Sequence, residues 1–295
     1  MILNKANMQN LFVSFNMAFK QGLGVAPGQY ERISMTIPSS TSENVYPWLG
    51  RLPGMREWIG DRVIHNLALH DYSIKNRTFE TTVSVRQEDI EDDQFGMYGP
   101  IFSDLGAQAS IHPNQLVFGA LKAAHQNPCY DGRPFFAKDH PVGAVKYSNL
   151  LEADKAPGEP WYLMCTKRPI RPIIFQRRKP YELTRMDKPT DENVFMRSEY
   201  LYGVQARVNV GYGLWQLAIR CTGKLDADSY REARALMAGY KDENGNPLGL
   251  MPDLLVAPPT LEADARKLLV NAFSANGATN EWAGSAELLV TPWLA

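Results

Sequence analysis

The longest regular pattern in this sequence is helical and covers residues 98–126. Apolar residues recur through it at steps of four, as they do along one face of an α-helix. They are Ile101, Leu105 and Ala109, followed by Leu116, Ala120 and Ala124. Pro113 falls near the middle, where it either kinks one helix or begins a second as its first residue. The pattern therefore predicts a long helical segment, kinked or divided at the proline.

Strand patterns lie on both sides of this helical segment. Residues 72–86 alternate apolar and polar side chains, with a break at Asn76-Arg77, and residues 199–220 alternate again, with Val204, Ala206, Val208 and Val210 on one face. Shorter strands are expected at 32–37, 161–165, 170–176, 254–257 and 288–290. Two further helices are expected, one at 227–240 that is capped by Asp226 and one at 260–272 that is capped by Thr260. Helices and strands are intermixed without regular βαβ alternation, which indicates the α+β class.

The N-terminus has the pattern of an amphipathic helix. Met8, Phe12, Phe15 and Phe19 share one face, and Gly22 follows as a stop signal. A single short helix does not bury such a face alone, so it must pack on something else. Two alternatives remain at this point: the helix packs on its own domain, or it packs on a neighbouring chain.

Residues 46–60 combine large aromatic, charged and helix-breaking residues with neither helical nor strand periodicity. Such a loop, rich in Trp, Tyr, Met and Arg, has the residue bias of an interface core. The alternative is an ordinary long loop folded on its own surface.

The composition excludes several classes of protein. Lys and Arg total 31 against 32 Asp and Glu, and this net charge of −1 argues against a dedicated nucleic-acid binder while leaving self-association unopposed. No apolar run reaches the roughly 18 residues of a membrane span. The three cysteines form no CxxC pair, so neither a disulfide framework nor a structural zinc site is expected.

Signals for catalysis are weak. The sequence has no G-x-S-x-G elbow, no P-loop and no H-E-x-x-H motif. A metal-dependent hydrolase that uses His65, His70 and His140, with Asp71 and Asp139, is one alternative, although nothing in the sequence brings these residues together. Asp139-His140-Pro141 is more typical of a turn with a local hydrogen bond.

Charged residues are segregated along the chain. One acidic run, at residues 88–93, fits a solvated first helical turn better than a metal site. Its acidic members are Glu88, Asp89, Glu91, Asp92 and Asp93. A basic stretch at residues 167–188 fits a nucleic-acid face, a charged strand edge, or a partner for the acidic run on a neighbouring copy.

Several of these motifs together resemble the major head subunits, or major capsid proteins, of Mu-like phages and prophages. The residues that carry the resemblance are the runs 46–60, 88–93, 131–136 with 139–141, 202–207 with 213–216, 254–259 and 286–292. The resemblance covers nearly the whole chain, and the first run is long and unusual in composition. It implies the Hong Kong 97-type capsid fold, in which an arm and an extended loop reach over neighbouring subunits.

Within that fold, residues 1–45 are expected to form the N-terminal arm and residues 46–77 the extended loop. Residues 78–140 are expected to form the peripheral domain with its spine helix, joined by a returning strand at about 199–220. The remainder, 141–295, is expected to be mostly axial domain.

The resemblance implies a structural protein without catalytic residues, cofactor or metal. The resemblance also implies that the chain self-assembles into pentamers and hexamers, which form an icosahedral head around double-stranded DNA. The expected partners are further copies of the chain, a separate scaffolding protein, a portal protein, a decoration protein and non-specifically contacted DNA, with no membrane. Assembly is expected in the host cytoplasm and the final location is the virion. No lysine lies between Lys20 and Lys75, so isopeptide cross-linking from the loop is not expected.

The candidate contact residues follow from this scheme. Loop anchors and their charged rim are Trp48, Arg51, Leu52, Met55, Arg56, Glu57, Trp58, Asp61 and Arg62, and arm contacts are Phe12, Phe15 and Phe19. Pairing between subunits is expected to join the acidic run to Arg177, Arg178 and Lys179. The alternatives that stay open are the metal-dependent hydrolase, a nucleic-acid-binding protein and the shell of a protein nanocompartment.

Overall fold

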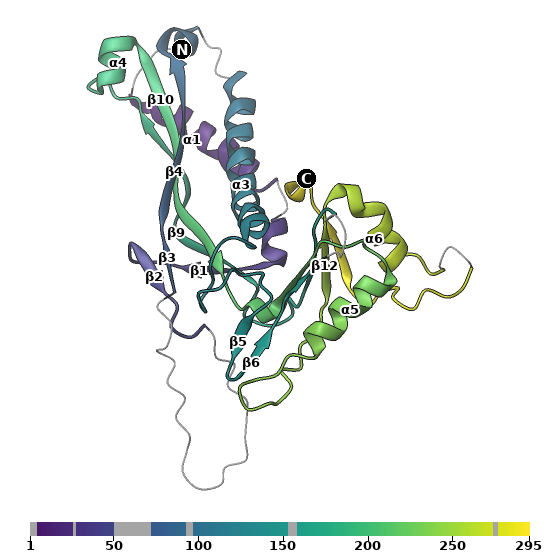
Figure 1. Ribbon diagram of the computed structural model, residues 1–295. Coiled ribbons are helices and arrows are strands. Elements are labelled where there is room, and N and C mark those ends of the chain that lie inside the picture. Colours follow the sequence, from purple (N-terminus) through teal and green to yellow (C-terminus); the bar gives the residue numbers. More distant parts are fainter. Residues whose placement is uncertain (1–4, 26–27, 50–71, 93–96, 153–157, 274–276) are drawn as a thin grey trace.

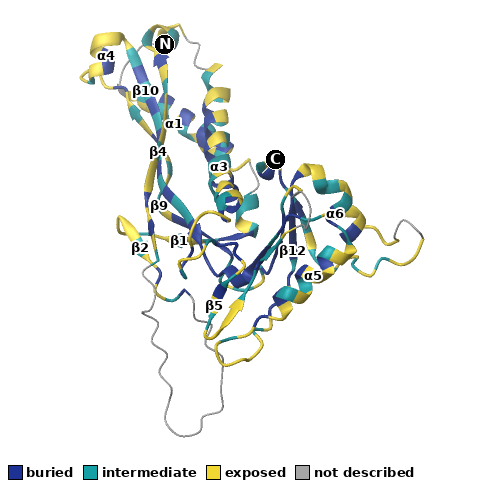
Figure 2. Cartoon of the chain, viewed as in Figure 1, coloured by how far each residue is buried: buried dark blue, intermediate teal, exposed yellow. Residues whose placement is uncertain are grey.

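The structure is a computed structural model that describes residues 5–25, 28–49, 72–92, 97–152, 158–273 and 277–295. A long sheet with two helices along it is joined at one end to a compact second sheet (Figure 1). Figure 2 shows that the second sheet is deeply buried, whereas the far end of the long sheet is mostly exposed. The mixed architecture confirms the predicted α+β class.

The long sheet has four strands, and its central strand alternates as predicted. Along β10 the side chains of Tyr200, Tyr202, Val204, Ala206 and Val208 are buried and those between them are not. β10 pairs antiparallel with strands on both sides, and β1 completes the sheet in parallel. The spatial order is β1 (Ser34–Pro38), β9 (Ile173–Met186), β10 (Glu199–Tyr212) and β4 (Arg77–Arg86).

The predicted strand over 199–220 is wrong beyond Tyr212. The backbone of Gly213 passes close to the chain at residues 171–172 and donates a 2.8 Å hydrogen bond to the carbonyl of Pro172. A side chain does not fit at this approach, and the chain then turns through a 3-10 segment at Trp215–Leu217. The continuation, β11 (Ala218–Cys221), belongs to the second sheet.

Two helices, α1 (Lys5–Leu23) and α3 (Tyr98–Ala123), pack on each other beside the long sheet. α3 is one helix that continues through Pro113, so the alternative of two separate helices is wrong. Proline inside a helix costs about 3 kcal/mol. Here the turns that follow bury Val117, Phe118 and Leu121 completely, and this packing outweighs the cost.

The predicted break at Asn76 is confirmed, because it separates β3 (Ser73–Lys75) from β4. β3 pairs antiparallel with β2 (Glu43–Val45). Residues 88–91 of the acidic run lie in the short helix α2 (Gln87–Glu91), as the helical interpretation predicted. A second short helix that was not predicted, α4 (Glu192–Arg197), lies between β9 and β10.

The second sheet has five strands and a fully apolar centre. Every residue of β8 (Trp161–Met164) and β12 (Leu254–Ala257) is buried, and both lie where strands were predicted. The spatial order is β13 (Glu287–Val290), β12, β8, β11 and β7 (Leu150–Leu151). A separate hairpin pairs β5 (His140–Val142) with β6 (Val145–Tyr147).

Two helices pack on this second sheet. α5 (Ala227–Ala238) begins with a capping box in which Asp226 and Ser229 exchange hydrogen bonds, which confirms the predicted N-cap. The predicted cap at Thr260 is wrong, because its hydroxyl donates to Glu159 instead and a 3-10 turn at Pro259–Leu261 precedes α6 (Glu262–Leu269). Among the residues that the structure describes, no helix has the length and apolar character needed to cross a membrane.

Candidate interaction surfaces

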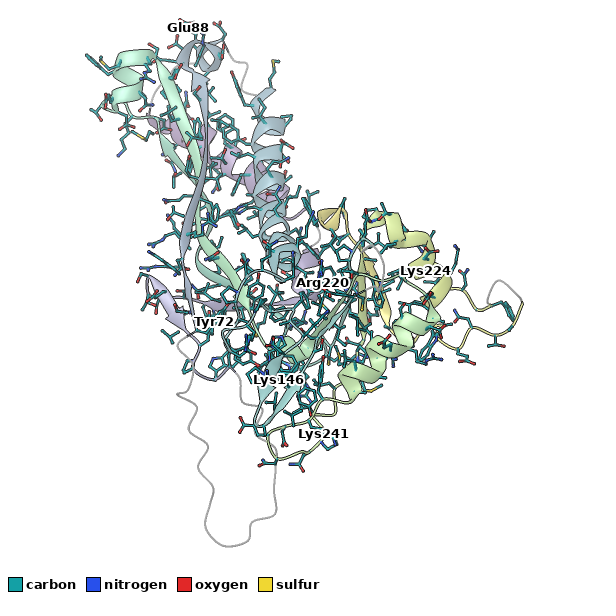
Figure 3. All side chains as sticks on the ribbon, viewed as in Figure 1. Tyr72, Glu88, Lys146, Arg220, Lys224 and Lys241 are labelled. Carbon is teal, nitrogen blue, oxygen red and sulfur yellow. The ribbon has the colours of Figure 1, made fainter. Side chains whose placement is uncertain are left out.

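The segment predicted as an interface loop leaves and re-enters the fold at a single point. β2 and β3 pair across residues 43–45 and 73–75, and the amide of Tyr46 donates to the carbonyl of Tyr72 at 2.8 Å. The chain between these strands therefore starts and ends side by side. Figure 3 shows Tyr72 at the end of the long sheet opposite Glu88.

A buried glutamine anchors this root of the loop. Gln176, in β9, is fully buried and accepts a 2.7 Å hydrogen bond from the hydroxyl of Tyr46. Its amide nitrogen donates to the carbonyl of Ile74 and to Oδ1 of Asn76, both at 2.9 Å. The sequence analysis missed this anchor, because the only local signal was a polar residue inside an apolar strand.

Of the nine predicted loop contacts, the described part of the chain includes Trp48 alone. Trp48 is half-buried against the subunit's own core, and its ring centroid lies 6.0 Å from that of Tyr46 in a T-shaped arrangement. The other eight lie outside the described residues: Arg51, Leu52, Met55, Arg56, Glu57, Trp58, Asp61 and Arg62.

The apolar face of α1 packs on its own chain, so the expected arm contacts need correction. Phe15 and Phe19 are 2% and 1% exposed. Phe15 stacks on Phe102 of α3 at 4.1 Å between centroids and meets Tyr202 of β10 edge-on at 5.3 Å. Phe12 is half-buried beneath the guanidinium of Arg185, 4.4 Å from its ring centre. Phe15 and Phe19 therefore belong to the core of the subunit, because α3 and β10 supply the apolar surface that the helix lacked.

The acidic and basic clusters lie apart within one subunit. Glu88, Asp89, Glu91 and Asp92 lie on α2 or directly after it at the far end of the long sheet, and Asp93 lies outside the described residues. Arg177, Arg178 and Lys179 lie in the part of β9 nearer the loop root, where Arg177 pairs with Pro38 and Val208. Lys179 donates to Gln205 at 3.2 Å. Pairing of these clusters between subunits stays a prediction.

The structure brings His140 together with Asp131 and Cys129, and among the described residues of the proposed metal set Asp139 is not part of this group. Nδ1 of His140 lies 2.6 Å from Oδ2 of Asp131, and the Cys129 thiol donates to Oδ1 of Asp131 at 3.1 Å. The ligand atoms of all three lie within 4.8 Å of one another. Asp139 instead pairs with Arg133 at 3.3 Å, and His65, His70 and Asp71 lie outside the described residues.

The neighbouring Asn149 holds the ring of His140 in place. Its amide nitrogen donates to three backbone carbonyls, those of Phe135, Trp215 and Ala218. Its Oδ1 is therefore the acceptor that faces Nε2 of His140 at 3.1 Å, and Nδ1 of the same ring faces the Asp131 carboxylate at 2.6 Å. The result is a buried, hydrogen-bonded histidine–aspartate pair whose histidine ring stacks on Trp215 at 4.2 Å between centroids.

The protonation states of Asp131 and Cys129 suit a structural network better than a catalytic one. Burial is the largest influence on Asp131 and acts to raise its pKa, but hydrogen bonds from His140 and Cys129 outweigh it and hold the pKa below its usual range. Burial, followed by the negative charge of Asp131, raises the pKa of the Cys129 thiol. The thiol therefore stays protonated, whereas nucleophilic attack and metal binding both require a thiolate.

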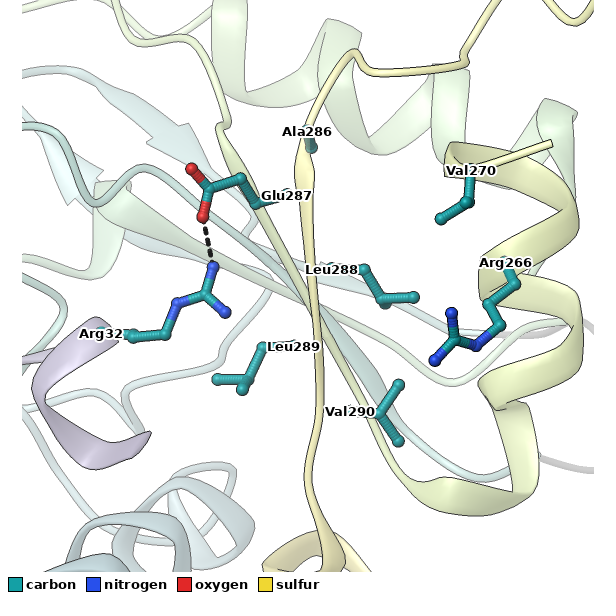
Figure 4. A pocket seen from close by; sticks show the side chains of 8 residues that line it. All are labelled: Arg32, Arg266, Val270, Ala286, Glu287, Leu288, Leu289 and Val290. Atoms are coloured by element: carbon teal, nitrogen blue, oxygen red, sulfur yellow. Dashed lines mark hydrogen bonds and ion pairs between the residues drawn. The ribbon is translucent and has the colours of Figure 1, made fainter. Parts of the chain in front are cut away.

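Two open grooves on the described surface are lined by charged and apolar side chains. One, of about 590 Å³, runs along the edge strand β13 between Arg32 and Arg266, with Arg32 paired to Glu287 at 2.5 Å (Figure 4). A second, of about 660 Å³, lies beside it and includes Lys167, Arg168 and Arg171. Neither is lined by a histidine or a cysteine.

Comparisons with known proteins agree with this architecture along the whole chain. Residues 8–294 match the family described as Mu-like prophage major head subunit gpT. The major capsid protein of Escherichia phage Mu is 40% identical over 305 residues, which cover 100% of both chains. Among solved structures, the procapsid of bacteriophage JBD30 matches with a TM-score of 0.89 at 42% identity, over 99% of this chain and 100% of that chain. The JBD30 capsid decorated with minor capsid protein trimers matches with a TM-score of 0.79 at 32% identity, over 100% of both chains.

The fold and its surfaces together define a phage capsid protein of the Hong Kong 97 type, built as a long sheet with a spine helix and a compact second sheet. The chain belongs to the Mu-like prophage major head subunit family. It is a structural protein of the virion and not an enzyme, so the hydrolase and nanocompartment alternatives find no support.

Proposed function

We propose that this subunit assembles into pentamers and hexamers that close an icosahedral head around double-stranded DNA. The observation that carries the proposal is the agreement of the whole chain, rather than of one domain, with the subunit of an assembled procapsid. Rings of subunits joined by heterologous contacts close around five- and six-fold axes. Each contact can be weak, because a subunit held on several sides gains by multivalency.

The parts of the chain divide this task. Residues 46–77 serve as the extended loop, 78–140 as the start of the peripheral domain, and most of 141–295 as the axial domain. Of the predicted arm, residues 1–45, α1 packs on α3 and β1 pairs with β9 of the same subunit, which supports placing these two elements in the peripheral domain. The pairing of β9 with β10 supports moving residues 173–212 into the peripheral domain, because both strands belong to the long sheet. The rigid root at Gln176 supports an extended-loop role for the segment between β2 and β3.

Expression of the chain together with the products of neighbouring phage genes tests the proposal. Closed shells in negative-stain electron microscopy are expected, and their absence under these conditions would contradict it. The contents separate two kinds of shell, because a phage head encloses DNA and a nanocompartment encloses protein cargo.

Replacing Trp58 by alanine is expected to leave the subunit folded and to abolish closed shells. A Trp anchor is typical of an interface hot spot, where truncation costs 2 kcal/mol or more, to order of magnitude. The measurements are the thermal melting of the unassembled subunit and a count of shells by electron microscopy. Normal heads from this variant would overturn the assignment of the loop.

Trp48 offers a matched control for that variant. Because Trp48 packs on the subunit's own core, its replacement by alanine is expected to lower the free energy of unfolding by roughly 2 kcal/mol. Comparing the Trp58→Ala and Trp48→Ala variants thus separates a loss of assembly from a loss of folding stability. Equal melting temperatures for wild type and Trp48→Ala would contradict the packing described here.

The further partners follow the family scheme. We infer a separate scaffolding protein, a portal protein and assembly in the host cytoplasm. The JBD30 capsid carries minor capsid protein trimers, which supports a decoration protein on this shell as well. A net charge of −1 suits a wall that encloses DNA without binding it tightly.

A further inference from the structure

The edge strand of the second sheet, β13, has an open side. Its only strand neighbour in the described part of the chain is β12. The amides of Glu287 and of Thr291, which directly follows the strand, donate to carbonyls on the β12 side at 2.8 and 3.1 Å. Because the backbone groups of alternate residues point to opposite sides of a strand, those of Leu288 and Val290 point away from β12. Such a row of backbone donors and acceptors is a template for a further strand.

The groove of about 590 Å³ follows this open side of β13. All residues from 286 to 290 line it, whichever face of the sheet their side chains take. Figure 4 shows the strand between Arg32 on one side and Arg266 on the other. Both arginines are balanced, because Arg32 is paired with Glu287 at 2.5 Å and Arg266 with Glu262 at 2.7 Å. A strand laid along this edge therefore runs between two ion pairs and does not meet an unpaired charge in this groove.

One wall of the groove is apolar. Val270, directly after α6, is 56% exposed, and Leu288 and Val290 are half-buried on the same side of β13 (Figure 4). Successive side chains of a strand point to opposite faces, so an added strand directs every second side chain toward this wall. Apolar side chains at those positions would bury Val270, which the subunit by itself leaves in water.

The second groove adjoins the first and has a surplus of positive charge. Its charged lining consists of Arg32, Lys167, Arg168, Arg171, Glu31, Asp253 and Glu287. Because Arg32 and Glu287 are paired, three cations stand against two carboxylates, and none of these five forms an ion pair within the described ranges. Arg168 and Arg171 each donate to a backbone carbonyl, whereas Lys167 is exposed. An acidic side chain is therefore favoured beside Lys167.

We propose that the open side of β13 takes up an extended segment of another protein by strand addition. The segment directs alternate apolar side chains toward Val270 and carries an acidic side chain toward Lys167. In this mode of recognition the main-chain hydrogen bonds, here to Leu288 and Val290, give affinity, and the alternate side chains give specificity. The inference goes beyond the proposed shell, because it concerns a protein other than the subunit and can be tested on the unassembled chain.

A second copy of the chain fits this edge less well. Two β13 strands paired side by side would bring the surplus positive charge of both copies together, which is unfavourable. The heterologous contacts of the proposed rings also do not place two identical edges against each other. A segment of different sequence avoids both problems.

Two synthetic peptides test the binding. One short peptide alternates valine and glutamate, and its control alternates valine and lysine. The labelled glutamate peptide is expected to bind the unassembled subunit in fluorescence anisotropy, and the control to bind about tenfold more weakly or not at all. The net charge of −1 gives the whole subunit no general attraction for an acidic peptide. Equal binding of the two peptides, or no binding of the glutamate peptide, would overturn the proposal.

Two variants locate the binding at β13. Val290→Pro removes an outward amide but none of the hydrogen bonds to β12, and an edge strand tolerates proline at such a position. The variant is expected to stay folded and to bind the glutamate peptide about tenfold more weakly. Lys167→Glu leaves the strand intact and is expected to weaken binding by a similar factor. Undiminished binding by Lys167→Glu, or by Val290→Pro with the wild-type melting temperature, would overturn the proposal.

A crosslink identifies the occupant in assembled material. A photo-crosslinking amino acid at Val290, in subunits expressed with the products of neighbouring phage genes, is expected to link to a segment of another protein that alternates apolar and acidic residues. Links to a second copy of the chain would overturn the proposal. Closed shells with such links would still leave the proposed shell function standing.

Discussion

Replacing Gly106 by alanine is expected to destabilise the subunit by about 3 kcal/mol, although alanine is the better helix former. Gly106 lies where α3 crosses α1, and a Cβ atom there would fall 2.8 Å from the backbone nitrogen of Leu23 and closer still to the carbonyl of Phe19. Gly22, on the opposite helix, is equally tight, with a Cβ 2.9 Å from the nitrogen of Ala107. Because these neighbours are backbone atoms, the helices must move apart and the stacked Phe15 and Phe102 must separate.

Gly119, on the same helix, is the matched control. A Cβ atom there meets nothing within 4 Å, so Gly119→Ala is expected to stabilise the subunit by about 0.5–1 kcal/mol. Urea denaturation of the unassembled subunit, followed by circular dichroism, measures both changes. Equal effects of the two substitutions would show that helix propensity, and not the helix crossing, governs these positions.

Replacing Asp131 by asparagine is expected to lower the free energy of unfolding by about 2–3 kcal/mol, because the hydrogen bonds to its charged carboxylate are buried. The substitution turns one carboxylate oxygen beside His140, which is 0% exposed, into an amide nitrogen. The one remaining side-chain oxygen must then serve His140, the Cys129 thiol and the backbone amide of Arg133. Asp139→Asn is the matched control, because Asp139 belongs to the same segment but pairs with Arg133 at the surface, where loss of an ion pair costs at most about 1 kcal/mol.

The same pair predicts a pH dependence whose sign follows from the lowered pKa of Asp131. A carboxylate with a depressed pKa in the folded state stabilises the protein above its unfolded pKa of about 3.9. That contribution is lost as the pH falls through the lower folded pKa. Wild type should therefore lose more stability than Asp131→Asn between about pH 5 and pH 2, and parallel unfolding curves over this range would contradict the stabilising role of the Asp131 carboxylate.

Elements with a strong local period were predictable. β10 shows its alternation in the sequence, and α5 begins at a capping box because Asp226 and Ser229 satisfy backbone donors within one turn. The end of β10 was not predictable, because the approach of Gly213 to Pro172 joins residues 41 positions apart. Thr260 failed as a cap for the same kind of reason, since its hydroxyl bonds to Glu159 across the fold.

The features of the contact surfaces can likewise be divided into those that the sequence predicted and those that it did not. The resemblance carried by residues 46–60 was enough to indicate a shell protein, because an unusual composition is visible without coordinates. The root of that loop, held by Gln176, was not visible, because it joins strands that are distant in sequence.

The local sequence specified periodicity. It determined the long helix, the strands and the exposed or buried face of each, because these depend on side chains a few residues apart. Which other segment packs on each buried face was decided only when the chain folded. The apolar face of α1 had two candidate partners until α3 and β10 buried Phe15 and Phe19 within the subunit. His140 likewise had a metal or a turn as alternatives until Asp131 and Asn149 surrounded it. Burial and charge compensation are long-range properties, so only the assembled chain selects among the alternatives that a local pattern leaves open.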